Sequence, residues 1–194
     1  MEALMDAPAA RPGSALGTEP RETREPAPTT FVLRRLFAER LTDAHLPFLR
    51  RMDNNAQMMA SLGGVRSDAE TKAYLERNLA HWEEHGFGIW ILRDPMTGRV
   101  FGRAGLRHLS VEGTPEVELA YALLPEFWAR GLATDAARAC VTIGREWLGL
   151  PSVVALTTAD NLASQRVLLK AALAQNARLP TAGGRTFCTG RIRR

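Results

Sequence analysis

The sequence predicts an α+β domain with a central, mostly antiparallel sheet and flanking helices. Three strand-like runs, 87–92, 100–109 and 116–124, follow one another through short turns, which is typical of an antiparallel sheet. A helix at 132–148, a strand at 152–157 and a helix at 162–174 come next, and they predict one βαβ unit. The chain has 194 residues, 45% of them hydrophobic, which is enough for one buried core.

The first 28 residues differ in composition from the rest of the chain. They are rich in Pro, Ala, Glu and Thr and contain few large apolar side chains, so we expect a disordered tail at 1–28 and a folded domain at 29–194. Glu2 and Asp6 replace the basic start of a secretory signal. The chain also lacks the roughly 18 consecutive apolar residues of a membrane span. We therefore expect a cytoplasmic protein.

The first half of the domain contains one sharply delimited helix. Ser67 and Glu70 form a capping box, an apolar stripe follows, and Gly86 comes after the last turn, so the spacing predicts a helix over 68–85. The stripe consists of Leu75, Leu79 and Trp82. Before this helix we expect a strand at 31–37 and an irregular helical region at 41–59, and after it a turn at 94–98.

The second half contains a helix with a buried stripe and the two cysteines. The helix at 132–148 is expected to end at Gly149 and Pro151. Its expected stripe is Ala136, Cys140, Ile143 and Trp147. Residues 181–184 should turn between two final strands. Cys140 and Cys188 are too few for a disulfide framework or a four-thiolate zinc site, and we expect both to be small buried hydrophobes.

The charge of the expected domain suits an anionic ligand. The whole chain carries +4, whereas residues 31–194 hold 22 basic and 16 acidic residues, or +6, because the first 30 residues hold three Arg and five Asp or Glu. The short basic cluster at 191–194 has no interleaved aromatic residues, so nucleic-acid binding is not expected.

The segment 128–134, Trp-Ala-Arg-Gly-Leu-Ala-Thr, joins an expected strand to an expected helix. Such a turn presents unpaired backbone N–H groups at the positive end of the helix dipole, where a phosphate binds well. Gly131 permits close approach of the backbone, Arg130 adds positive charge and Thr134 adds a hydroxyl donor. Taken alone, the segment also fits an ordinary strand–helix turn.

Two longer blocks decide between these interpretations. Residues 118–136 (ELAYALLPEFWARGLATDA) resemble the acetyl-CoA-binding motif of the GNAT N-acetyltransferases. Residues 161–170 (NLASQRVLLK) and 85–90 (HGFGIW) resemble the ribosomal-protein N-terminal acetyltransferase-like branch of that family. The resemblance extends from about residue 31 to the C-terminus, and it implies a GNAT fold with acetyl-CoA as the cofactor.

The resemblance assigns a place to each part of acetyl-CoA. The strand carrying Glu118 and the strand ending at Thr157 would run parallel and splay apart, with pantetheine in the gap against the backbone of Leu123. Asn161 would contact the pantetheine arm or simply cap its helix, and Ser164 would lie on a face that meets the cofactor. The pyrophosphate would bind the N–H groups of Arg130, Gly131, Leu132, Ala133 and Thr134.

The chain departs from the family pattern at three places. Ala129 replaces the first glycine of the loop, and Ala172 replaces a glycine that commonly ends the second helix, so that helix could run longer. Leu168 stands where many GNAT enzymes place a tyrosine acid. The departing sulfur would then leave as the thiolate or take a proton through water.

A primary amine must lose a proton before it attacks a thioester. The resemblance places Glu118 as the candidate general base, acting directly or through water. Glu116 lies on the same strand two residues away. The two carboxylates could raise one another's pKa, or both could face solvent at a sheet edge.

The amine acceptor is not specified by the sequence. We expect acceptor contacts from the region 46–65, from Phe87 and from Trp90, with either a protein N-terminus or a small molecule as the primary amine. A catalytically silent acyl-CoA-binding module is the alternative to an acetyltransferase. GNAT relatives are often dimers, which leaves a homodimer open.

The histidines carry no metal motif in the sequence. His81 and His85 share a helix face, but Trp82 occupies the position of the glutamate in the zinc-protease motif, so no metal site is expected. His108 could relay a proton or be an ordinary surface histidine.

Overall fold

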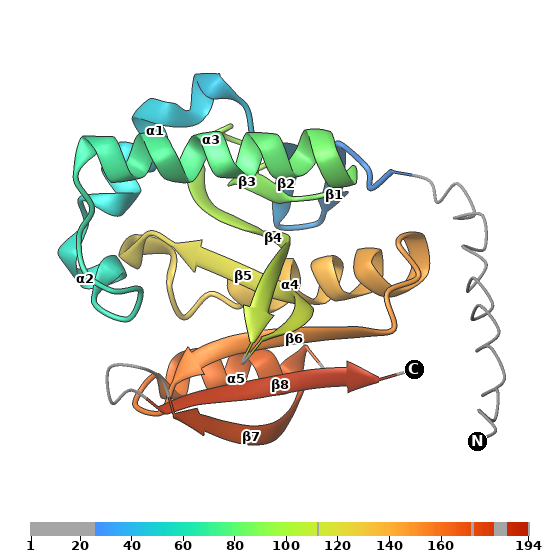
Figure 1. Cartoon of the computed structure of the whole chain (residues 1–194). Coiled ribbons are helices and arrows are strands. Elements are labelled where there is room, and N and C mark those ends of the chain that lie inside the picture. The colour runs from blue at the N-terminus through green and yellow to red at the C-terminus, as the bar shows by residue number, and fades with distance from the viewer. Residues whose placement is uncertain (1–25, 112, 172, 181–185, 194) are drawn as a thin grey trace, which may run out of the picture.

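The computed structural model describes residues 26–111, 113–171, 173–180 and 186–193, without the side chains of 174–180 and 186–193. These residues form one eight-stranded sheet with helices on both sides (Figure 1). Among them, no helix combines the length and the apolar character needed to cross a membrane. The elements are β1 (Thr30–Leu33), β2 (Leu36–Arg40), η1 (Asp43–His45), α1 (Leu46–Asp53), α2 (Ala56–Met59), α3 (Asp68–His85), β3 (Ile89–Arg93), β4 (Val100–Val111), β5 (Thr114–Leu123), η2 (Pro125–Phe127), α4 (Leu132–Thr142), η3 (Ile143–Trp147), β6 (Ser152–Thr158), α5 (Leu162–Lys170), β7 (Ala174–Pro180) and β8 (Thr186–Arg193).

The strand order in the sheet is β1-β2-β3-β4-β5-β6-β8-β7. All neighbouring pairs are antiparallel except β5 and β6, which run parallel and are paired only at Glu118 and Val154. The parallel pair therefore diverges from a single point of contact. This arrangement confirms the expected α+β class with a mostly antiparallel sheet and splayed parallel central strands.

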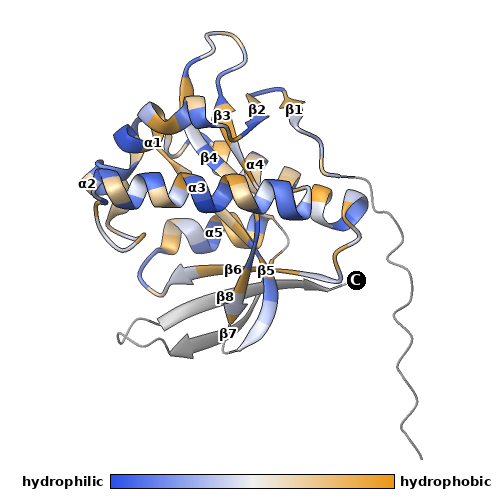
Figure 2. Cartoon of the chain, turned by 45° about the horizontal axis from the view of Figure 1, so that its top comes forward, coloured by the Kyte–Doolittle hydropathy of each residue, from blue (hydrophilic) through white to orange (hydrophobic). Residues whose placement is uncertain are grey.

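Helix α3 forms where the sequence predicts it. The Ser67 side chain accepts a hydrogen bond from the Glu70 backbone N–H at 3.3 Å, and Glu70 Oε2 accepts one from the Ser67 N–H at 2.8 Å. Gly86 ends the helix with a left-handed φ of 71°. Hydrophobic and hydrophilic residues alternate along α3, as expected of a helix that packs on one side only (Figure 2).

The helices pack against the sheet from both sides. Helices α1 and α3 form a cluster with β3 through buried side chains such as Leu49, Leu75 and Ile91. Helix α4 adds Ala136 and Cys140 to the larger cluster. Both views place α3 in front of the sheet and α4 behind it (Figures 1 and 2).

The strand expected at 31–37 and the helix expected at 162–174 differ in the structure. The strand expected at 31–37 is a hairpin, in which Leu33 pairs with Leu36 around a two-residue turn. The turn residues, Arg34 and Arg35, include no Gly, Pro, Asn or Asp, so no turn signal interrupts the alternation. The helix expected to reach residue 174 ends at Lys170, and β7 begins at Ala174. Ala171 caps α5 with a φ of −86°, while Ala172 lies outside the described residues.

The helix expected at 132–148 changes its winding near its end. It is α-helical to Thr142 and continues as a π-helical segment, in which the Leu148 N–H donates to the Ile143 carbonyl at 3.0 Å. This wider turn rotates the following side chains relative to the stripe. Trp147 is consequently 49% exposed, so its expected burial is wrong, whereas Cys140 is fully buried as expected.

Two residues of the expected tail at 1–28 form hydrogen bonds with the domain. Ala27 is buried, and its N–H donates to the Gly86 carbonyl at 2.9 Å. The Trp90 indole donates to the Pro28 carbonyl at 2.9 Å. Residues 1–25 of the expected tail, the 181–184 turn and the Cys188 side chain lie outside the described part of the structure, although the two strands expected around the turn are present.

Candidate active site

The segment between β5 and α4 presents an uncapped helix start. Ala129 and Gly131 both adopt left-handed conformations, with φ values of 58° and 76°. Gly131 is the N-cap of α4 and supplies no side-chain hydrogen bond to the first turn. The N–H groups of Leu132, Ala133 and Thr134, at the start of α4, therefore donate to no cap side chain. An uncapped helix start of this kind favours a bound anion.

Ala129 shows that the missing glycine does not remove the turn. A left-handed conformation costs an L-residue about 1–2 kcal/mol relative to a right-handed one. The fold nevertheless holds Ala129 in this conformation, with a φ of 58°.

Arg35, from the β1–β2 turn, lies against the same segment. Its Nε donates to Asp135 Oδ2 at 2.9 Å, and its NH1 group donates to the Arg130 carbonyl at 2.6 Å. A Cβ atom added at Gly131 would lie 2.9 Å from the NH2 group of Arg35. Arg35 thus holds the turn through the Arg130 carbonyl and Asp135, and it places a guanidinium next to Gly131. Sequence reasoning missed Arg35, because nothing in its local pattern connects it to a motif 95 residues away.

Two side chains connect the diverging strand β5 to helix α5. The Tyr121 hydroxyl lies 2.7 Å from Ser164 Oγ and donates to the Ser164 carbonyl at 3.3 Å. Burial raises the pKa of Tyr121 to about 12, so the phenol keeps its proton at neutral pH. Tyr121 was not among the expected site residues, although Ser164 was.

The backbone and cap positions expected near pantetheine already have protein partners. The Leu123 carbonyl accepts a hydrogen bond from the Trp128 indole at 2.7 Å. The Asn161 side chain accepts from the Ser164 N–H at 3.0 Å, which is the helix-cap alternative considered for Asn161. Leu168 is buried in the core, which suits a leucine in place of the family's tyrosine.

Glu118 lies at the one position where β5 and β6 pair, and it is only 6% exposed. Its Oε2 accepts a hydrogen bond from Arg107 Nε at 2.7 Å. Burial opposes the charged form of Arg107, but the charge and hydrogen bond of Glu118, together with Tyr74, outweigh this effect and raise the pKa of Arg107. Glu116 instead accepts from Ser152 Oγ at 3.3 Å. The alternative in which both carboxylates face solvent is therefore wrong for Glu118.

The two aromatic residues expected to contact the acceptor lie in the core. Trp90 has no exposed surface, and Phe87 is 5% exposed. Trp90 packs edge-on against Trp82, and both side chains belong to the hydrophobic core. Leu62 and Val65, at the end of the region 46–65, are exposed and remain available for an acceptor.

Comparison with known proteins agrees with this geometry. The family model described as "Acetyltransferase (GNAT) domain" matches residues 35–173. The chain belongs to the GNAT acetyltransferase family. The resemblance expected from residues 118–136 and 161–170 is thereby confirmed.

Solved structures of GNAT proteins superpose on most of the chain. An acetyltransferase from Agrobacterium tumefaciens str. C58 is 25% identical with a TM-score of 0.76, covering 90% of this chain and 99% of that one. The ribosomal L7/L12 α-N-protein acetyltransferase RimL, in complex with coenzyme A, is 16% identical with a TM-score of 0.71 (87% and 98% covered). A spermidine N-acetyltransferase from Vibrio cholerae, in complex with CoA and spermine, is 14% identical with a TM-score of 0.68 (83% and 96% covered). At these identities the last two comparisons show the fold.

Proposed function

We propose that this acetyltransferase transfers the acetyl group of acetyl-CoA to a primary amine, either a protein N-terminus or a small molecule. The observation that carries the proposal is the uncapped start of α4 behind two left-handed residues, Ala129 and Gly131. This start is joined through η2 to β5, the strand that diverges from its parallel neighbour. The solved relatives that bind CoA have names that include protein and polyamine acetyltransferases, which supports an amine acceptor.

In this proposal the anionic pyrophosphate binds the N–H groups of residues 130–134, with the positive charges of Arg130 and Arg35 beside it. Pantetheine extends between β5 and β6, past Leu123 and toward Ser164. Holding the thioester and the amine in line supplies most of the rate, about 7–11 kcal/mol for well-oriented reactants.

The reaction is a direct attack of the amine nitrogen on the thioester carbonyl. The new C–N bond forms, the C–S bond breaks and the sulfur leaves with its electron pair. Glu118 accepts the proton lost by the amine, directly or through water. The sulfur leaves as the thiolate or takes its proton from water.

Acetyl-CoA is expected to stabilise the protein against thermal unfolding. A ligand at about 100 times its Kd adds roughly 2.7 kcal/mol, which raises the unfolding midpoint of a domain of this size by about 5–10 °C. The measurement is a thermal melt with and without acetyl-CoA, followed by a screen of amine acceptors for CoA release. Absence of a shift at millimolar acetyl-CoA would contradict the proposal. A shift without turnover for protein N-termini, polyamines and amino acids would favour the silent acyl-CoA-binding module instead.

Replacing Arg35 by Gln should weaken acetyl-CoA binding by roughly tenfold. A hydrogen bond from a charged donor contributes about 1.5–3 kcal/mol, and the partial exposure of Arg35 reduces this value. Arg34, an exposed residue of the same turn, provides the matched control with the same change of charge. Equal acetyl-CoA affinities of the R35Q and R34Q variants in calorimetric titration would remove Arg35 from the cofactor site.

A further inference from the structure

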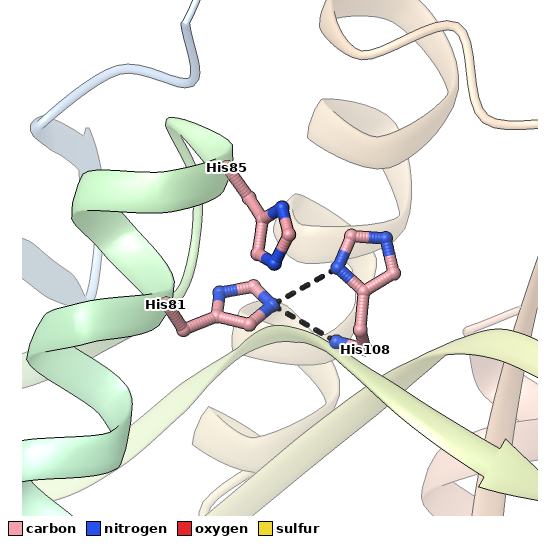
Figure 3. Close-up of side chains that lie close together, drawn as sticks. All are labelled: His81, His85 and His108. Atoms are coloured by element: carbon pink, nitrogen blue, oxygen red, sulfur yellow. Dashed lines mark hydrogen bonds between the residues drawn. The ribbon is translucent and has the colours of Figure 1, made fainter.

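Three of the four histidines in the chain come together at one place in the fold. His81 and His85 lie one turn apart near the end of α3, and His108 comes from β4 (Figure 3). One ligand nitrogen of each imidazole lies within 4.8 Å of the other two. None of these residues belongs to the turn at 128–134 or to the hydrogen bonds between β5 and α5.

The spacing of the ring nitrogens matches that of a metal site. Zinc–nitrogen distances of about 2.0–2.1 Å in a tetrahedral site place two ligand nitrogens roughly 3.3–3.4 Å apart. His81 Nε2 lies 3.2 Å from His108 Nδ1. The ring centroids of His85 and His108 are 4.3 Å apart, and the His85 ring turns a nitrogen toward the other two (Figure 3).

Two hydrogen bonds to the backbone fix the state of His81. Its Nδ1 lies 2.8 Å from the Phe87 carbonyl, which can only accept, so Nδ1 carries the proton. Its Nε2 lies 3.0 Å from the His108 backbone N–H, which can only donate, so Nε2 presents a lone pair. His81 is thus a neutral imidazole whose unprotonated nitrogen, Nε2, lies on the side of His108. A ligand histidine that donates its second N–H to a carbonyl is the usual arrangement at zinc sites.

The solvent exposure of the cluster leaves room for a further ligand. His108 is exposed, whereas His81 and His85 are half-buried. Three histidines with an open fourth position form a site for borderline metal ions such as Zn²⁺, in which water completes the coordination. The carboxylate of Glu84 lies 3.7 Å from His85 Nε2 and adds negative charge beside the cluster.

We propose that His81, His85 and His108 bind one divalent transition-metal ion of the Zn²⁺ class. The ion replaces the hydrogen bond that His81 Nε2 accepts in the metal-free protein and fastens the end of α3 to β4. This inference does not depend on the acetyl-transfer proposal, because its readout is the binding of the metal itself.

The test is a calorimetric titration of ZnCl₂ into tag-free, full-length protein that has been treated with a chelator and dialysed. We expect one Zn²⁺ per chain and a rise of several degrees in the unfolding midpoint. Co²⁺ in place of Zn²⁺ should give the visible ligand-field absorption of tetrahedral coordination. The H85Q and H108Q variants change partly or fully exposed side chains, and each should weaken Zn²⁺ binding by more than the roughly 10–100-fold lost with an outer-shell partner.

The fourth histidine supplies the control. His45 lies outside the cluster and is hydrogen-bonded to Glu39, so the H45Q variant should bind Zn²⁺ as the unchanged protein does. Melts without metal establish that each variant is folded. Absence of Zn²⁺ binding by the unchanged protein would overturn the proposal. So would H85Q and H108Q variants that bind Zn²⁺ as tightly as the unchanged protein does. The same affinity in the variants and in the unchanged protein would place the ion on other residues. The three imidazoles would then be a hydrogen-bonded cluster without a metal.

Discussion

Acetyl-CoA should no longer stabilise the protein when Gly131 is replaced by Glu. The new residue must adopt the left-handed φ of 76°, at a cost of about 1–2 kcal/mol, and its side chain starts beside the Arg35 guanidinium. Its carboxylate then competes for the place of the pyrophosphate, and a like charge within about 4 Å costs roughly 4 kcal/mol near a protein surface. We expect the Kd for acetyl-CoA to rise by at least about 100-fold, as measured by thermal shift and by calorimetric titration.

Gly98 offers a matched control for this substitution. It also has a left-handed φ, of 67°, in the β3–β4 turn, and an added Cβ atom would meet nothing within 4 Å. The G98E variant therefore carries similar backbone strain and the same change of charge away from the expected cofactor site. It should be destabilised yet respond to acetyl-CoA. An unchanged acetyl-CoA affinity in the G131E variant would refute the placement of the pyrophosphate at the start of α4.

Replacing Glu118 by Gln should lower kcat by about 10²–10⁴-fold without changing the affinity for acetyl-CoA. General base catalysis supplies a factor of this size, and Gln retains an oxygen for the hydrogen bond from Arg107 Nε. The loss should be greatest at low pH. An α-amino group has a pKa of about 7.7–8.0, so above this range the acceptor loses its proton to solvent without assistance. The measurement is a pH–rate profile of both proteins together with an acetyl-CoA titration.

Glu116 lies on the same strand and provides the control for Glu118. The E116Q variant makes the same chemical change at a carboxylate that bonds Ser152 instead of Arg107, and it should retain the normal pH–rate profile. If the E118Q profile also keeps its shape and its height, Glu118 is not the proton acceptor. In that case its pairing with Arg107 is structural.

Elements with local signals were predicted well. The capping box at Ser67 and the glycine at 86 set both ends of α3, because the hydrogen bonds that begin and end a helix involve residues three or four positions apart. The motif at residues 128–134 likewise identified the strand–helix turn before any tertiary contact was known. Elements without such signals were predicted poorly. The β1–β2 turn contains no turn-forming residue, and the π-helical segment that exposes Trp147 has no pattern in the sequence.

Contiguous motifs and short-range periodicity were enough to predict the family and the fold class, and they also predict which residues receive the cofactor's phosphates. Three contacts became visible only in the tertiary structure. Arg35 lies beside Gly131, Arg107 forms an ion pair with Glu118, and His108 lies next to two histidines of α3. These groups are brought together by sheet pairing and by helix packing between distant segments. No local pattern encodes such contacts, since Arg35, Arg107 and His108, each taken separately, are ordinary charged or polar residues.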